Sequence, residues 1–259
     1  MGHLSDIGFP FKQPEELQTF IAGIIEEGEP LPTQRGYYVF WSPGEGVELW
    51  IRVDNQRRLV GCSPHFTGTG QMQVGITQTF RNEERPLDGS CYAWADPQGD
   101  NPYSGLYPFV ADMPDFDLVE ERALLVPVVA MQIAAFSSEL RCYRSEGEFI
   151  SEQPDGSRPQ AESFTPTWRH GEDPTPEAHI TGRILEAEMR TNPATGQEFY
   201  AISIRTHGGT VDVVADPTLT KGRPAENGIV QGTFWLSARV ISDLPLPKQP
   251  RFPYRRRRG

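Results

Sequence analysis

The chain has 259 residues, of which 37% are hydrophobic, 25 are glycine and 24 are proline. That length can bury a sizeable core, and the glycine and proline content favours short strands joined by turns over long helices. There is no run of about 18 apolar residues, which excludes a membrane-spanning helix. The net charge is −11, with 12 basic and 28 acidic residues in 1–177 against 12 and 7 in 178–259.

The first predicted elements are a short strand over residues 3–11, ended by Pro10, and a helix after it. Pro14 suits the first helical turn, and the two glutamates that follow it favour the positive end of the helix dipole. Apolar residues then recur at helical spacing until Gly28, namely Leu17, Phe20, Ile21, Ile24 and Ile25.

Strands are predicted for the rest of the N-terminal half, because alternating and β-branched runs are separated by turn residues. The expected strands cover residues 36–41, 47–53, 58–62, 74–80, 91–95 and 107–112. Residues 124–143 are ambiguous, since 128–136 are almost continuously apolar. Their valine content and Pro127 favour a strand, and a buried helix is the alternative.

Proline-rich residues 150–177 have the composition of a linker. We therefore predict a mixed α+β domain over 1–149, a separate barrel over 178–243 and a disordered basic tail over 244–259. The expected class is α+β, predominantly antiparallel β with one clear N-terminal helix. Arg255–Arg258 in the tail could contact phosphates, fold back on the acidic N-terminal half, or serve solubility alone, since a terminal run of charge is usually a solvated tail.

The segment 178–241 contains four strand-like stretches, 178–191, 198–206, 210–216 and 228–241, with glycines at 182, 228 and 232. In strand number, strand length and glycine placement it resembles a small barrel of the oligonucleotide/oligosaccharide-binding (OB) type. That resemblance implies binding on an open sheet face, with bases stacked on aromatic side chains over a cationic groove.

The candidates for that face are Phe199, Arg205 and Trp235. Alternation places Tyr200, Ile202 and Ile204 on the core face of their strand, and Phe199 with Arg205 on the opposite face. Residues 178–247 carry a net charge of −1, which is unfavourable for neutralising phosphates. Packing or interface roles are therefore favoured for the aromatic residues, and single-stranded nucleic-acid binding is the alternative.

Residues 3–66 follow the order strand, helix and three strands, which is similar to one module of the vicinal-oxygen-chelate (glyoxalase-like) proteins. In that family metal ligands come from the first and fourth strands of modules. The resemblance would place ligands at His3 and His65, with Glu48 on the third strand. It implies a metal-dependent enzyme, although a second module with its own helix is not found in the sequence.

Catalytic motifs are otherwise missing from the sequence: it has no GxSxG elbow, phosphate loop, GxGxxG or HExxH. We therefore expect a non-enzymatic binding or interaction protein without a cofactor, whose partner is a protein or small molecule and not a membrane. An N-terminus without a signal sequence predicts a cytoplasmic location. The aromatic residues Tyr37, Trp41, Trp50 and Trp94 are where a ligand or partner groove is expected.

Overall fold

The computed structural model describes residues 3–153, 158–169 and 171–245, and it starts with a single 3-10 turn, η1 (Ser5–Ile7). The predicted strand over 3–11 is wrong. Leu4, Ile7 and Phe9 are all buried in one cluster, and Gly8 ends the turn in the left-handed region at φ 78°. The spacing of these apolar residues therefore belongs to a turn lying on the core, not to an alternating strand.

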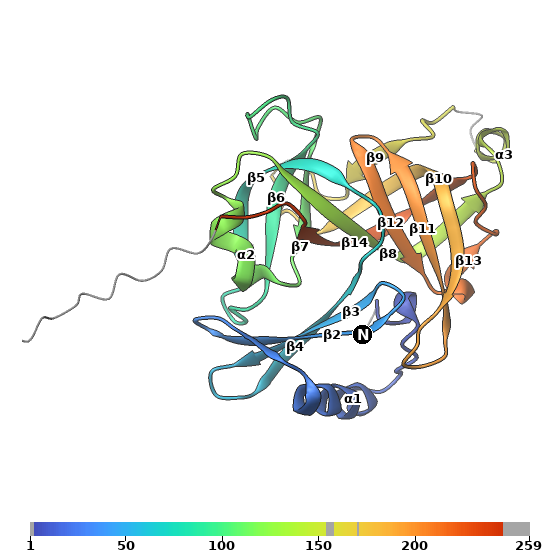
Figure 1. Ribbon diagram of the computed structural model, residues 1–259. Coiled ribbons are helices and arrows are strands. Elements are labelled where there is room, and N and C mark those ends of the chain that lie inside the picture. Colours follow the sequence, from blue (N-terminus) through green and yellow to red (C-terminus); the bar gives the residue numbers. More distant parts are fainter. Residues whose placement is uncertain (1–2, 154–157, 170, 246–259) are drawn as a thin grey trace, which may run out of the picture.

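Helix α1 (Pro14–Glu27) confirms the predicted helix. Glu16 accepts hydrogen bonds from the backbone N–H groups of Lys12 (3.2 Å) and of the N-cap residue Gln13 (3.4 Å), which fixes the chain where it enters the helix. Ile21 and Ile24 are its most buried side chains, in the same cluster as Phe9 and strand residues. Figure 1 shows α1 covering the outer face of the small sheet.

The small sheet has four strands in the order β1 (Pro30–Pro32), β2 (Gly36–Gly44), β3 (Val47–Asp54) and β4 (Leu59–Phe66). All neighbours are antiparallel, so the sheet is a meander of consecutive strands. It extends the hairpin expected at 36–53. Strand β3 is buried along nearly its whole length, since α1 lies on one side of the sheet and the large sheet on the other.

The large sheet has ten strands: β5 (Met72–Arg81), β6 (Gly89–Ala95), β7 (Pro108–Asp112), β8 (Val129–Tyr143), β9 (Ser163–Pro166), β10 (Glu177–Thr191), β11 (Glu198–Thr206), β12 (Gly209–Ala215), β13 (Thr220–Lys221) and β14 (Ile229–Val240). Three short helical elements lie between them: α2 (Phe116–Ala123), α3 (Glu146–Ser151) and η2 (Pro217–Leu219). Residues 129–143 are thus a strand, which resolves the ambiguity in favour of the preferred prediction. Sequence periodicity missed α2 and α3.

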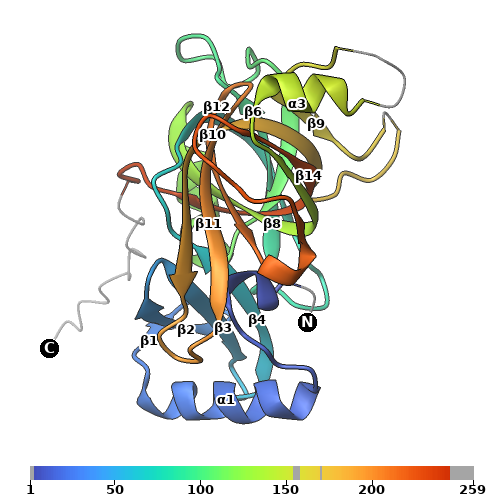
Figure 2. The ribbon, with the colours of Figure 1, turned by 90° about the vertical axis from the view of Figure 1, so that its right-hand side faces the viewer.

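Five of these strands close a ring, visible in Figure 2. Strands β10, β11 and β12 follow one another antiparallel, β12 pairs in parallel with β8, and β8 and β14 complete the circuit back to β10. Strand β8 belongs to residues 1–149, predicted as a separate domain, and β9 lies in the predicted linker. One sheet therefore runs through both predicted domains. The predicted tail lies outside the described residues apart from 244–245.

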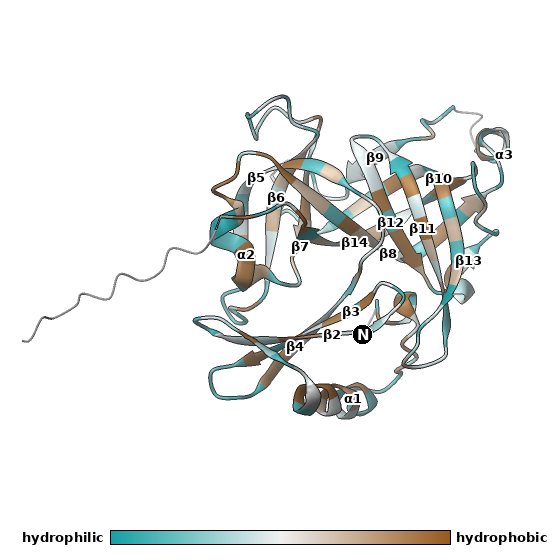
Figure 3. Cartoon of the chain, viewed as in Figure 1, coloured by the Kyte–Doolittle hydropathy of each residue, from teal (hydrophilic) through white to brown (hydrophobic). Residues whose placement is uncertain are grey.

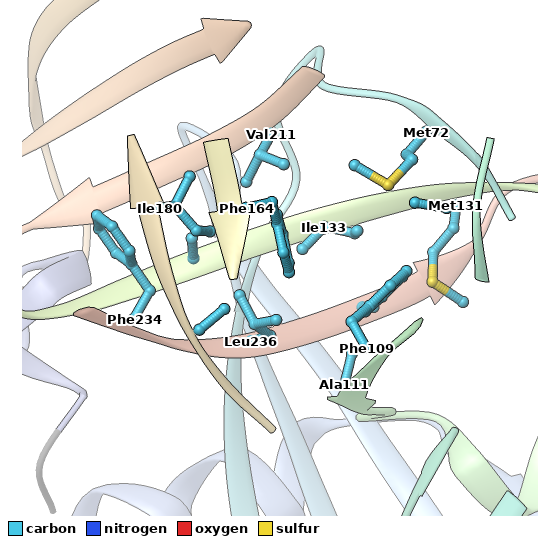
Figure 4. Close-up of a cluster of buried hydrophobic side chains, with 14 of the residues drawn as sticks. Met72, Phe109, Ala111, Met131, Ile133, Phe164, Ile180, Val211, Phe234 and Leu236 are labelled. Carbon is cyan, nitrogen blue, oxygen red and sulfur yellow. The ribbon is translucent and has the colours of Figure 1, made fainter. Parts of the chain in front are cut away.

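The main hydrophobic core fills the ring and continues under β5–β7, as Figure 4 shows. Ile133, Ile180 and Val211 point into it from three ring strands, and Met72 and Phe109 extend it outside the ring. Figure 3 shows apolar residues gathered along the strands and hydrophilic residues at the turns. The α+β class, mostly antiparallel β with an N-terminal helix, is confirmed.

Candidate ligand-binding cleft between the two sheets

Alternation along β3 and β4 divides the small sheet into an apolar and a polar face. Leu49 and Ile51 face α1 and belong to its cluster. The residues of β3 and β4 that alternate with this apolar set point towards the large sheet and contact polar residues there. We call this contact the polar interface; it comprises Glu48, Arg52, Ser63 and His65 from the small sheet and Asp112, Asp115, Gln132, Ser237 and Arg239 from the large-sheet side.

His65 is the centre of the interface and is wholly buried. Its Nε2 lies 2.7 Å from Gln132 Oε1 and its Nδ1 lies 2.9 Å from Ser237 Oγ. Because the Gln132 amide nitrogen donates to Asp212 (2.7 Å), Gln132 Oε1 must accept from His65. The imidazole is therefore protonated at Nε2, and Ser237 donates to Nδ1.

The Ser237–His65 contact has the separation of a nucleophile and its general base. Burial lowers the pKa of His65 to about 4, so the ring is neutral at pH 7. An enclosed, neutral histidine whose two nitrogens are both occupied joins the two sheets. With no exposed surface on His65, no substrate reaches the pair in this conformation.

A second buried group surrounds Arg239, which lies 4.7 Å from the centre of the Trp50 ring. Its guanidinium is 3.3 Å from Glu48 and 3.4 Å from Asp115. Glu48 also accepts from the Trp50 indole (2.9 Å) and the Thr67 hydroxyl (2.7 Å). Burial raises the pKa of Asp115, which Arg239 opposes. One arginine thus pairs with two carboxylates.

Beside these buried groups the polar interface opens into a hollow of about 270 Å³, which we call the arginine cleft. It is lined by Arg52 and Ser63 of the small sheet and by Phe80, Arg81, Asn82, Arg85, Asp88, Gly89, Ser90, Asp112 and Met113. The lining holds three arginines and two aspartates. Its formal charge is therefore +1 in a chain of net charge −11.

Arg52 lies at the back of the arginine cleft and is 5% exposed. Its Nη1 donates to Ser63 Oγ at 2.7 Å. A Cβ at Gly61 would lie 2.6 Å from Nη2 and 3.1 Å from Nε. The absence of a side chain at this position therefore provides the space for this edge of the guanidinium. Arg52 Nε is 2.5 Å from Asp88 Oδ1, yet both atoms lack a well-aligned hydrogen bond among the described residues.

The other charges of the cleft have partners on its rim. Arg85 Nε lies 3.2 Å from the second oxygen of Asp88, and Arg81 pairs with Asp117 and Glu120. Burial raises the pKa of Asp88, against the attraction of Arg52 and Arg85.

Asp112 closes the side of the cleft and accepts from Ser90 Oγ (2.5 Å) and the Trp235 indole (2.8 Å). Burial raises its pKa, and these two hydrogen bonds counteract that rise. Both aspartates of the cleft therefore gain protons more readily than a solvated carboxylate.

The structure does not gather the four aromatic residues of the expected groove. Tyr37 and Trp41 lie on the α1 side of the small sheet, where Trp41 meets Phe20 edge-on at 5.5 Å. Trp50 lies on the opposite face beside Arg239, and Trp94 is half-buried on β6 of the large sheet. Among them, Trp50 alone contacts residues of the polar interface, namely Glu48 and Arg239.

The three candidates from the predicted barrel are also apart. Phe199 is fully buried, because Phe66 and the N-terminal segment at Gly8 cover the outer face of β11 there. Arg205 is exposed and pairs with Glu162 at 2.9 Å. Trp235 is half-buried, bonded to Asp112 and stacked on His3 at 5.0 Å.

The metal-site candidates have other partners. His3 lies 3.3 Å from Asp6, His65 is occupied by Gln132 and Ser237, and Glu48 by Arg239, Trp50 and Thr67. Within the described residues, no three His, Cys, Asp or Glu side chains gather so that they could hold a metal ion.

The arginines and aspartates of the cleft were missed from the sequence. The one local signal was the alternation in Glu48-Leu-Trp-Ile-Arg52, which puts two charged residues on a face that should be buried. Asp88 and Asp112 stand at the ends of turn-like and strand-like segments, where aspartate is common.

A second groove crosses the outside of the ring along β14. Two hollows of about 330 Å³ each share Gln231, Gly232 and Thr233. The lining side chains largely pair with each other: Lys221 is 2.6 Å from Glu139, and Thr233 is 2.7 Å from His179.

Comparisons with models of protein families, with curated proteins and with solved structures found no match to this chain. None of the helices in the described part of the chain is both long and apolar enough to cross a membrane.

Proposed function

We propose that this chain is a cytoplasmic, non-enzymatic binding protein whose arginine cleft takes a small anionic ligand. The observation that carries the proposal is the buried guanidinium of Arg52 at the back of a 270 Å³ polar hollow. Burying a charge is unfavourable unless it is well paired, and its contact with Asp88 is poorly aligned. An anion in the hollow would supply the missing hydrogen bonds.

Electrostatics and position support the same proposal. Arg81 and Arg85 also line the hollow, each already paired with a carboxylate. Arginine presents a planar fork of donors that matches carboxylate and phosphate oxygens. The cleft lies between two sheets, and sites between structural layers are common places for small ligands.

The test is an NMR titration of ¹⁵N-labelled protein with acetate, succinate and inorganic phosphate in turn, with sodium chloride at matched ionic strength as a blank. We expect saturable shifts of the amides in 81–90 and 112–113 with at least one anion. Arg52→Lys should weaken that binding about tenfold or more, because lysine keeps the charge and loses the fork.

The matched control is Arg205→Lys, since Arg205 is an exposed arginine on β11 with its own carboxylate. Its binding curve should overlay that of the unmodified protein. If no anion produces a saturable shift beyond the chloride blank, the proposed function is wrong.

A second candidate is single-stranded nucleic acid or a related polymer on the ring. The five-strand ring and the groove along β14 support an OB-like reading, in which β8 supplies the fifth strand from earlier in the chain. Arg141 and Lys221 are the cations at one end of that groove. Binding of a labelled oligonucleotide should then weaken steeply with salt and be reduced by Arg141→Gln; salt-independent or absent binding contradicts it.

A further inference from the structure

The Asp88 side chain occupies the position at Arg52 where an anion would bind. Its two oxygens lie 2.5 Å from Arg52 Nε and 3.2 Å from Arg85 Nε, so one carboxylate spans both arginines. Arg52 Nε and Asp88 Oδ1 nevertheless have no well-aligned hydrogen bond. Because this carboxylate is fixed to the backbone, its oxygen comes close to the guanidinium but is not aligned with the N–H bond.

The backbone on either side of Asp88 is held in place. Leu87 is buried and its carbonyl accepts from the Tyr38 hydroxyl at 2.6 Å. The backbone carbonyl of Asp88 accepts from Asn82 at 3.0 Å and its amide donates to Arg85 at 2.8 Å. Rotation of the aspartate side chain, without movement of the turn, would therefore free the Nε and Nη2 edge of Arg52.

We propose, building on the anion-binding function above, that the ligand is an organic carboxylate and that Asp88 competes with it for Arg52. A free carboxylate can align both oxygens with the guanidinium edge, which a tethered one fails to do. The displaced Asp88 and Asp112 remain in the cleft. Their charges oppose a dianionic phosphate more strongly than a singly charged carboxylate.

The pH dependence of binding follows from the groups that face Asp88: Arg52 on β3, Arg81 and Arg85 beside it, and Asp112 on β7. Burial raises the pKa of Asp88. A protonated Asp88 attracts Arg52 less, so binding calculated from the concentration of the acetate anion, with the protonation of acetate itself taken into account, should strengthen as the pH falls from 7 towards the pKa of Asp88. Replacing Asp88 by asparagine should reduce this dependence.

The experiment compares acetate and phosphate titrations at pH 7 for the unmodified protein, Asp88→Asn and Asp88→Ser, with thermal unfolding to verify that each variant is folded. The serine variant provides an independent test if the asparagine variant fails to fold or forms a new contact through its amide. We expect acetate to bind the folded variants about tenfold tighter than the unmodified protein, and phosphate to gain at least as much, because the removed charge opposes a dianion more strongly.

Unchanged or weaker acetate binding in both folded variants overturns the competition by Asp88, as does tighter binding of phosphate than of acetate in the unmodified protein. Either result leaves the anion-binding function standing. If the unmodified protein binds no anion beyond the chloride blank, the function itself fails, and the inference fails with it.

Discussion

At the level of single residues, the polar interface combines paired charges with one buried neutral group, His65. His65 is neutral and makes two short hydrogen bonds across the two sheets. Removing one partner of such a bond leaves the other unsatisfied, which costs about 1–3 kcal/mol. The free energy of unfolding should therefore be sensitive to His65 and to pH.

Replacing His65 by glutamine tests this role. The pKa of His65 is about 4 in the fold against 6.5 for an ordinary histidine, so the unfolded chain takes up a proton first as the pH falls. This difference lowers the free energy of unfolding by up to about 3 kcal/mol between pH 6.5 and 4. Burial raises the pKa values of Asp112, Asp115 and Asp212. These three residues therefore change the free energy of unfolding with pH in the opposite direction.

The contributions of these aspartates cancel when both proteins are unfolded by denaturant at the same pH values and their free energies of unfolding are compared. At pH 7 the unmodified protein should be more stable than His65→Gln, and the difference should shrink at pH 4.5. A difference that is the same at both pH values would show that His65 is not held neutral.

At the level of elements, β8 is the strand on which the large sheet depends. It pairs with β5, β12, β13 and β14, and it closes the ring. Its residues alternate between two clusters: Ile133 and Ala135 face the main core, while Ala134 and Phe136 face the cluster that contains α1. This double burial explains why its sequence is almost continuously apolar.

A fragment containing residues 178–243 should therefore fail to fold, although it contains four of the five ring strands. Without β8, the edges of β12 and β14 are unpaired and the ring core is open to water. We expect a broad, non-cooperative thermal transition by circular dichroism, against a cooperative one for the full-length chain. A cooperative transition and dispersed NMR spectrum for the fragment would contradict the role given to β8.

Local pattern predicted α1 and most strands because their signals lie within a few residues: Pro14 and Glu16 at the helix start, alternation in Val74–Phe80. The ring could not be predicted, since β8 and β14 meet through residues about 100 positions apart, such as Phe136 and Trp235. The arginine cleft could not be predicted for the same reason. Arg52 is on β3 and Asp88 lies in the loop between β5 and β6, and neither stands in a motif.

At the level of the whole molecule, the two sheets meet through both apolar and polar contacts. The cluster that contains α1 also includes Phe136 of β8, Phe199 of β11 and Val214 of β12, so it joins the small sheet to the outer face of the ring. Beside it, the sheets approach across Glu48, Arg52 and His65. Buried polar contacts stabilise less than apolar packing of equal area. The interface is open at one side to a hollow of about 270 Å³, which residues of both layers line.

The Arg52 side chain itself can report on the ligand. In a ¹⁵N-labelled sample its Nε–Hε resonance, identified by its loss in Arg52→Lys, is followed while acetate is added at pH 7. We expect that resonance to shift saturably together with that of Arg85, while the resonance of Arg205 stays in place. An Arg52 resonance that does not move, or that moves no more than Arg205, would contradict anion binding in the arginine cleft.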